Sequence, residues 1–178
     1  MAAVKKGIEE KIKKIKLLIF DVDGVLTDGG IIYNDEGQEL KVFDVRDGHG
    51  IKLLMRAGID VAIITARESR AVSFRAANLG IEHVYQGMRD KAEALGLILE
   101  KKALAPEEAG YVGDDVIDLP VIKRVGFSAA VADAVDEVKQ RVDYVTKMPG
   151  GRGAAREVVE LILKTQGKWD GIIEKYLA

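Results

Sequence analysis

Acidic side chains follow two of the short apolar runs in this sequence. Two aspartates follow the run at residues 17–20 and three follow the run at 110–112, giving the set Asp21, Asp23, Asp114, Asp115 and Asp118. If both runs are strands of one parallel sheet, these carboxylates meet at the carboxyl edge of that sheet. Carboxylates so close together repel one another unless a cation lies among them, and oxygen ligands of this kind favour Mg²⁺. The spacing therefore predicts a magnesium site.

Two further polar residues could complete a site for phosphoryl transfer. Thr65 follows the apolar run at 61–64, and Lys91 lies near the start of a helical stretch. A hydroxyl and an ammonium can both donate to phosphoryl oxygens as their charge changes in the transition state. Taken singly, Asp-x-Asp-Gly and Gly-Asp-Asp are more typical of turns and helix caps. Their order, each at the end of a run, favours a catalytic set.

The elements that must position these residues alternate along the chain. Compact apolar runs typical of buried strands occur at 17–20, 61–64, 83–85, 110–112, 125–127 and 144–145. Helical stretches occur at about 2–16, 48–57, 68–79, 90–102, 116–124, 133–141 and 153–165, and the tail after Thr165 has a helical pattern. The alternation predicts an α/β fold: a doubly wound parallel (Rossmann-like) sheet with helices on both faces. Between residues 29 and 44, two short apolar segments flank Asn34-Asp35-Glu36-Gly37, which predicts an inserted β-hairpin.

Composition narrows the class of protein. The chain has 178 residues, which fits a single domain spanning 1–178, and no cysteine, which excludes disulfides and a thiol nucleophile. A formal net charge of −2 offers no general basic field for nucleic acid or an anionic membrane surface. No apolar run approaches the roughly 20 residues that span a bilayer, and the first residues do not resemble a signal peptide. We expect a cytoplasmic protein that binds a small ligand.

In this order, the polar residues resemble the four motifs of the haloacid dehalogenase-like phosphohydrolases. The resemblance covers residues 17 to about 165 and rests on Asp21 with Asp23, then Thr65, Lys91, and Asp114 with Asp118. It implies that Asp21 is a nucleophile that forms an aspartyl-phosphate and that Asp23 is the general acid and base.

The resemblance also implies a role for each remaining acidic residue. Asp21, the backbone carbonyl of Asp23 and Asp114 would bind Mg²⁺, while Asp118 would orient Lys91 or a metal-bound water. Asp115 is either a second acidic group behind the metal ligands or the cap of the helix expected to begin at residue 116, and both interpretations stay open.

The same resemblance suggests a substrate. The chain has no room for a cap domain, and capless members of the family that carry such a hairpin form tetramers in which a neighbouring subunit covers each site. They imply an acidic sugar phosphate, most closely 3-deoxy-D-manno-octulosonate 8-phosphate, with Arg46, Asp47, Arg67 and Arg152 as candidate contacts. A lone arginine near the start of a helix is more often a solvated or ion-paired surface residue. The alternatives are a sialic-type nine-carbon acid phosphate, another small phosphomonoester, or a catalytically idle binding oligomer.

Overall fold

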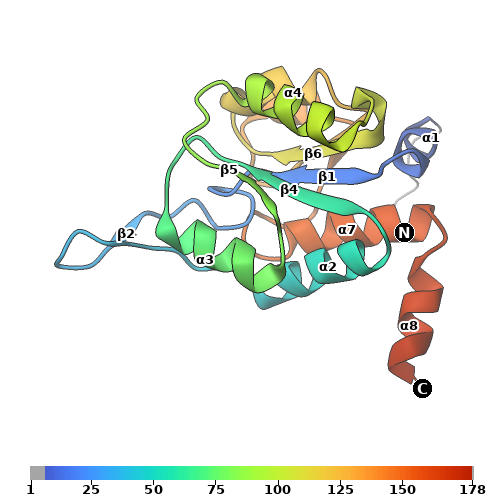
Figure 1. The fold of residues 1–178 in the computed structure, drawn as a ribbon, viewed down its shortest axis with the longest axis horizontal. Coiled ribbons are helices and arrows are strands. Elements are labelled where there is room, and N and C mark those ends of the chain that lie inside the picture. Colours follow the sequence, from blue (N-terminus) through green and yellow to red (C-terminus); the bar gives the residue numbers. More distant parts are fainter. Residues whose placement is uncertain (1–6, 178) are drawn as a thin grey trace.

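The computed structural model describes residues 7–177, which form a six-stranded parallel sheet with helices on both faces (Figure 1). The strand order is β5-β4-β1-β6-β7-β8. The strands are β1 (Leu17–Phe20), β4 (Asp60–Ile64), β5 (His83–Tyr85), β6 (Ala109–Gly113), β7 (Phe127–Ala130) and β8 (Tyr144–Val145). This confirms the predicted doubly wound sheet.

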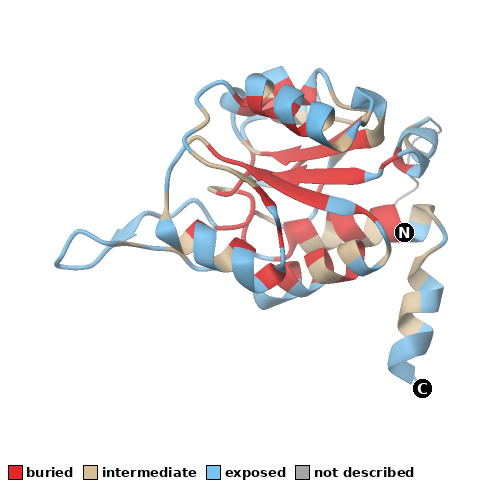
Figure 2. Cartoon of the chain, in the orientation of Figure 1, coloured by how far each residue is buried: buried red, intermediate tan, exposed pale blue. Residues whose placement is uncertain are grey.

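The central strands are continuous apolar runs because both faces of the sheet are covered. All four residues of β1 and all five of β6 are buried, as Figure 2 shows by the red strands at the centre of the molecule. Strand β1 pairs in parallel with β4 on one side and with β6 on the other. A strand buried on both faces needs no polar alternation, so short runs of Leu, Ile, Val and Phe are sufficient.

Helices cover both faces of the sheet. In Figure 1, α4 lies above the sheet, while α2, α3 and α7 lie below it. The helices are α1 (Ile8–Lys13), α2 (Val45–Arg56), α3 (Arg70–Leu79), α4 (Lys91–Lys102), α5 (Leu119–Ile122), α6 (Asp136–Lys139), α7 (Ala154–Thr165) and α8 (Trp169–Leu177), with 3₁₀ turns η1 (Pro106–Glu108) and η2 (Val116–Asp118). Among residues 7–177, no helix is long and apolar enough to cross a membrane.

Several boundaries differ from those expected. Strand β7 begins at Phe127 instead of residue 125, and the amide of Gly126 just before it donates to the carbonyls of Pro106 and Ala109. The strand then continues through Ser128-Ala129-Ala130, whose small side chains gave no apolar signal. The stretch expected as one helix at 116–124 is instead a 3₁₀ turn followed by the short α5. Residues 2–6 of the expected N-terminal helix lie outside the described part.

The predicted hairpin is present and projects from the body beside α3 (Figure 1). Its strands, β2 (Ile32–Tyr33) and β3 (Glu39–Leu40), pair antiparallel. The side chain of Asn34 accepts hydrogen bonds from the amides of Glu36 and Gln38 in the turn. Gly37 has φ +73°, a left-handed conformation that favours glycine. Most residues of the hairpin are exposed (Figure 2), so its outer face is available to a partner.

Candidate active site

The acidic residues lie where the strand order of the sheet reverses. After β1 the chain continues to β4 and β5 on one side, and it later returns to β6 on the other side. Asp21 follows β1, Asp114 follows β6 and Thr65 follows β4, so all three lie at the carboxyl edge of the sheet. In open α/β sheets this switch point is the usual ligand site.

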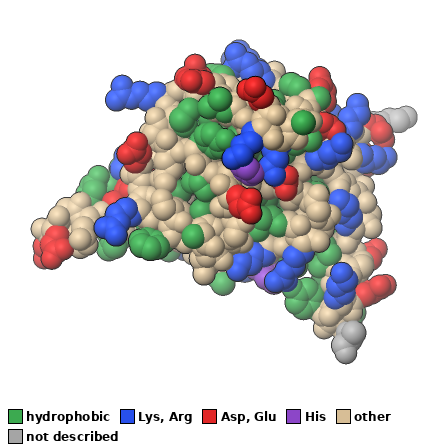
Figure 3. Space-filling view, viewed as in Figure 1, with side chains coloured by type: hydrophobic (Ala, Val, Ile, Leu, Met, Phe, Trp, Pro, Cys, Tyr) green, Lys and Arg blue, Asp and Glu red, His purple; other side chains and the backbone are tan. Residues whose placement is uncertain are grey.

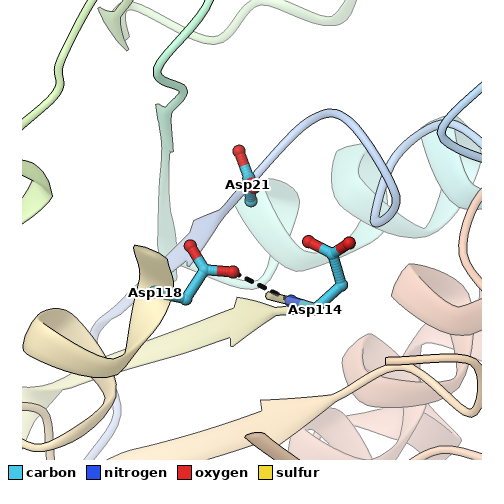
Figure 4. Close-up of side chains that lie close together, drawn as sticks. All are labelled: Asp21, Asp114 and Asp118. Atoms are coloured by element: carbon cyan, nitrogen blue, oxygen red, sulfur yellow. Dashed lines mark hydrogen bonds between the residues drawn. The ribbon is translucent and has the colours of Figure 1, made fainter. Parts of the chain in front are cut away.

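Three carboxylates converge at this edge (Figure 4). Asp21, Asp114 and Asp118 each present an oxygen atom, and these atoms lie within 4.8 Å of one another. The carboxylate of Asp118 accepts hydrogen bonds from the amides of Asp114 at 2.9 Å and Asp115 at 3.3 Å, which fixes the loop after β6. The amide of Val22 donates to Asp21 at 2.7 Å. The cluster is therefore built by backbone contacts as well as by sequence position.

The protein disfavours negative charge on this cluster in the absence of a cation. Burial raises the pKa of Asp21 to about 6, with a further contribution from the charge of Asp118 and an opposing one from Lys91. Burial likewise raises the pKa of Asp114 to about 8, and the charges of Asp21 and Asp118 add to that effect. A divalent cation bound among these groups would offset both the effect of burial and the repulsion between the carboxylates.

The donor set fits Mg²⁺. All the converging side chains offer carboxylate oxygens, and Oδ1 of Asp114 is buried without a hydrogen-bond partner among the described residues. Gly24 has φ +85°, and a Cβ at this position would overlap the carboxylate of Asp114. Glycine is thus required there for the chain after β1 to approach the cluster. The side chain of Asp23 is not part of the cluster.

Lys91 is the cation that the protein itself supplies to this cluster. Its ammonium lies 2.8 Å from Asp21 Oδ2, 2.7 Å from Asp118 Oδ1 and 3.3 Å from the hydroxyl of Tyr111, and its side chain is 1% exposed. Burial opposes the charge, but the two carboxylates outweigh it and raise the pKa of Lys91. Asp90 caps α4 by accepting from two backbone amides, which makes Lys91 the first residue of that helix.

The side chain of Asp23 points toward the hairpin residues. Its Oδ1 is paired with the ammonium of Lys41, which also lies 3.3 Å from Glu39 Oε1. The guanidinium of Arg67 lies 2.7 Å from Glu39 Oε1, and its Nε lies 3.9 Å from Asp23 Oδ2. These four residues form an alternating network of charges between the hairpin and the loops after β1 and β4.

A cleft brings together most of the residues expected at the site. It is lined by Asp21, Asp23, Thr65, Ala66, Arg67, Lys91, Asp114, Asp115 and Ile117. Thr65 is buried, and its hydroxyl accepts from the amide of Arg67 at 3.3 Å. Asp115 lines the cleft and also caps η2, because its carboxylate accepts from the amide of Val116 at 2.7 Å. Its capping role is thus observed directly.

Three residues expected to contact a substrate do not line this cleft. Asp47 is buried, and its carboxylate accepts hydrogen bonds from the amides of Gly153 and Arg156 at the start of α7, which gives it a structural role. Arg46 is exposed and lies 3.4 Å from Asp44, and Arg152 is exposed and lies 3.1 Å from Asp28. Of the three candidate arginines, Arg67 is the one that lines the cleft.

Sequence reasoning missed three residues of the site. Glu39 and Lys41 alternate with exposed apolar residues in the hairpin, and this alternation could have indicated a charged face turned toward the body. Tyr111 donates its hydroxyl to Asp118 at 2.6 Å from within a buried strand. Nothing in the apolar run around Tyr111 distinguishes that hydroxyl from an ordinary core aromatic.

Comparison with known proteins identifies relatives of this chain. The family model described as haloacid dehalogenase-like hydrolase matches residues 80–157. The 3-deoxy-D-manno-octulosonate 8-phosphate phosphatase KdsC of Escherichia coli (strain K12) is 53% identical over 167 residues, covering 94% of this chain and 89% of that protein.

Solved structures give the same result. The crystal structure of 3-deoxy-D-manno-octulosonate 8-phosphate phosphatase from Yersinia pestis has a TM-score of 0.92 and 48% identity, covering 93% of this chain and 90% of that one. The enzyme of the same name from Moraxella catarrhalis, in complex with magnesium ion, phosphate ion and KDO molecule, has a TM-score of 0.93 and 45% identity, covering 95% of this chain and 97% of that one. The chain therefore belongs to the family of haloacid dehalogenase-like hydrolases that includes the 3-deoxy-D-manno-octulosonate 8-phosphate phosphatases.

Proposed function

We propose that this protein is a magnesium-dependent phosphatase that releases phosphate from 3-deoxy-D-manno-octulosonate 8-phosphate. The observation that carries the reaction type is the position of Asp21, which is buried beside Lys91 in a cluster of three carboxylates at the switch point of the sheet. The substrate is that of the relatives, which are about half identical over nearly the full chain.

In the first step the carboxylate of Asp21 attacks phosphorus. A bond forms between the Asp21 oxygen and phosphorus as the bond between phosphorus and the ester oxygen breaks. Asp23 gives a proton to the departing ester oxygen, which leaves as the alcohol. Lys91, held in place by Asp118, and the hydroxyl of Thr65 stabilise the charge on the phosphoryl oxygens.

In the second step a water molecule attacks the phosphorus of the aspartyl-phosphate. Asp23, now ionised, accepts a proton from that water, and the bond between phosphorus and the Asp21 oxygen breaks. Inorganic phosphate is released, Asp21 returns as a carboxylate, and Asp23 is protonated again. Asp115 and Ile117 also line the cleft in which both steps take place.

Asp21 and Asp114, with the backbone carbonyl of Asp23, would hold the magnesium ion. When bound, Mg²⁺ supplies positive charge that offsets the repulsion between the carboxylates and the incoming phosphate. Asp118 is less suited to direct binding, because one of its oxygens accepts from Lys91 and Tyr111 and the other from two backbone amides.

The hairpin supports a second part of the proposal, assembly as a homotetramer. Ile32 and Leu40 are cross-strand partners on one face, and Val42 follows on that face; they are 46%, 51% and 60% exposed. Figure 3 shows hydrophobic side chains on the projecting hairpin. A two-stranded hairpin is marginal in isolation, so burial against another copy would stabilise it. Arg46 and Arg152, which do not reach the cleft of their own subunit, would then contact the substrate only from a neighbour.

A substrate profile tests the proposed activity. Purified protein is assayed with Mg²⁺ on 3-deoxy-D-manno-octulosonate 8-phosphate, a sialic-type nine-carbon acid phosphate and neutral sugar phosphates. We expect the highest kcat/KM on the eight-carbon acid phosphate and no turnover in excess chelator. A higher kcat/KM on the nine-carbon acid would change the substrate but not the reaction. Absence of magnesium-dependent turnover on every ester would contradict the proposal.

A further inference from the structure

The hairpin places one lysine inside the site. The side chain of Lys41 is 1% exposed, and its ammonium pairs with Oδ1 of Asp23 and lies 3.3 Å from Glu39 Oε1. Burying an ammonium is costly unless carboxylates and hydrogen bonds satisfy it in a defined geometry. The side chain of Lys41 is buried and paired with two carboxylates, although most of the hairpin around it is exposed. We therefore expect its ammonium to be held in one defined position.

The alternation of the strand explains how the hairpin reaches the site. Glu39 and Lys41 are two residues apart, so their side chains lie on the same face, whereas those of Leu40 and Val42 lie on the opposite, exposed face. Arg67, from the loop after β4, lies 2.7 Å from Glu39 Oε1. Glu39 therefore pairs with both Lys41 and Arg67. Neither of these two cations has Asp23 as its only acidic partner.

The contacts distinguish the two oxygens of Asp23. Oδ1 accepts from the Lys41 ammonium, which has only donors to offer. Oδ2 is buried and has no hydrogen-bond partner among the described residues, with Arg67 Nε 3.9 Å away. While Lys41 donates to Oδ1, Oδ2 is the oxygen left to carry a proton. The lysine therefore fixes both the rotamer of Asp23 and the oxygen at which transfer takes place.

We propose that Lys41 is a positioning residue for Asp23: it holds Oδ1 so that Oδ2 delivers the proton to the departing ester oxygen. The inference rests on the proposed function, because it assigns Lys41 an effect only through the general acid of that reaction. Two other roles have different consequences. A lysine that only supported the hairpin would affect all substrates equally, and one that bound the substrate carboxylate would affect KM alone.

The test compares two leaving groups. Departure of the sugar alcohol needs a proton, whereas p-nitrophenolate leaves p-nitrophenyl phosphate without one. The variants are Lys41→Met, which keeps the length of the side chain, Lys41→Arg, which keeps the charge, Asp23→Asn, and Lys123→Met, a matched substitution at an exposed lysine outside the cleft. For each variant kcat and KM are measured separately with Mg²⁺ on the sugar phosphate and on p-nitrophenyl phosphate. Their ratio kcat/KM reports steps up to departure of the leaving group, and the separate KM values reveal a loss that comes from substrate binding alone.

We expect Lys41→Met to lower kcat/KM on the sugar phosphate by about 10- to 100-fold and on p-nitrophenyl phosphate by less than about threefold. Lys41→Arg should recover part of the loss, and Lys123→Met should match the natural protein. Asp23→Asn should show the same discrimination between substrates, to a larger extent.

Equal losses on both substrates for Lys41→Met, a change in KM alone, or no loss would each overturn the inference if Asp23→Asn does discriminate. In those cases the proposed function stands and only the role of Lys41 is wrong. If Asp23→Asn lowers kcat/KM equally on both substrates, the acid role of Asp23 fails and the inference fails with it. Thermal unfolding and size in solution identify a variant whose loss comes from misfolding, and the Lys41→Arg variant then provides the comparison of substrates.

Discussion

The ammonium of Lys91 lies 2.7 Å from the carboxylate of Asp118, and both side chains are almost completely buried. The same ammonium lies 2.8 Å from Asp21, so one cation joins the first residue of α4 to the loops after β1 and β6. Asp118 in turn accepts from the hydroxyl of Tyr111. Each member of this group is placed by a different element, and the site depends on all of them.

Replacing Lys91 with methionine should therefore reduce stability as well as activity. The substitution leaves Asp21 and Asp118 close together without the cation that faces them. Removing one partner of a buried ion pair costs about 3–5 kcal/mol. Urea unfolding in excess chelator measures the loss, and saturating Mg²⁺ should recover part of it. Lys123→Met, at an exposed lysine, is the control; equal stability of the two variants would contradict the role given to Lys91.

Magnesium should stabilise the fold more strongly at higher pH. The folded-state pKa values of Asp21 and Asp114, about 6 and about 8, both exceed the ordinary value of 3.8. The folded protein therefore retains protons that the unfolded chain has lost, and its stability in chelator falls as pH rises from about 4 to about 8. Mg²⁺ binds the ionised carboxylates and offsets this loss. The increase in Tm on adding Mg²⁺ should be larger near pH 8 than near pH 5, and an equal or smaller increase would contradict this view of the cluster.

Replacing Asp47 tests its structural role. Its carboxylate accepts from the amides of Gly153 at 3.1 Å and Arg156 at 2.8 Å, where α7 begins. Asp47→Ala leaves both amides without this acceptor and should cost about 1–3 kcal/mol of the free energy of unfolding. Asp47→Asn keeps one acceptor oxygen and should cost less. A fall in kcat/KM with unchanged stability would instead support the substrate contact expected from the sequence.

Assembly through the hairpin can be tested by placing a charge on its apolar face. Ile32→Glu should lower the oligomeric state measured by light scattering. Burying the face shared with Leu40 and Val42 against another copy would then also bury the new carboxylate, which costs free energy. Leu97→Glu on α4 is a matched control, since Leu97 and Ile32 are both 46% exposed. If Ile32→Glu keeps the size of the natural protein, the hairpin does not form the interface.

The same feature of the sequence, the ends of the apolar runs, allowed both the parallel sheet and the carboxylate cluster to be predicted. Each apolar run ends where the chain meets the carboxyl edge, so Asp21, Thr65 and Asp114 could be placed together from their position alone. The partner of Asp23 could not be predicted this way. Lys41 is 18 residues away in sequence, and it reaches Asp23 only because the hairpin folds back toward the loop after β1. The structural role of Asp47 could not be predicted from the sequence either, because its carboxylate contacts backbone amides more than 100 residues away.

Identification of the phosphorylated residue during turnover tests the central claim most directly. The protein is mixed with Mg²⁺ and excess sugar phosphate, quenched in acid within the first turnovers, and digested for mass spectrometry. The nucleophile assignment predicts a phosphoryl group on the carboxylate of Asp21, and none on any residue of the Asp21→Asn variant. Turnover that proceeds with the phosphoryl group on a different residue, or in the Asp21→Asn variant, would contradict it.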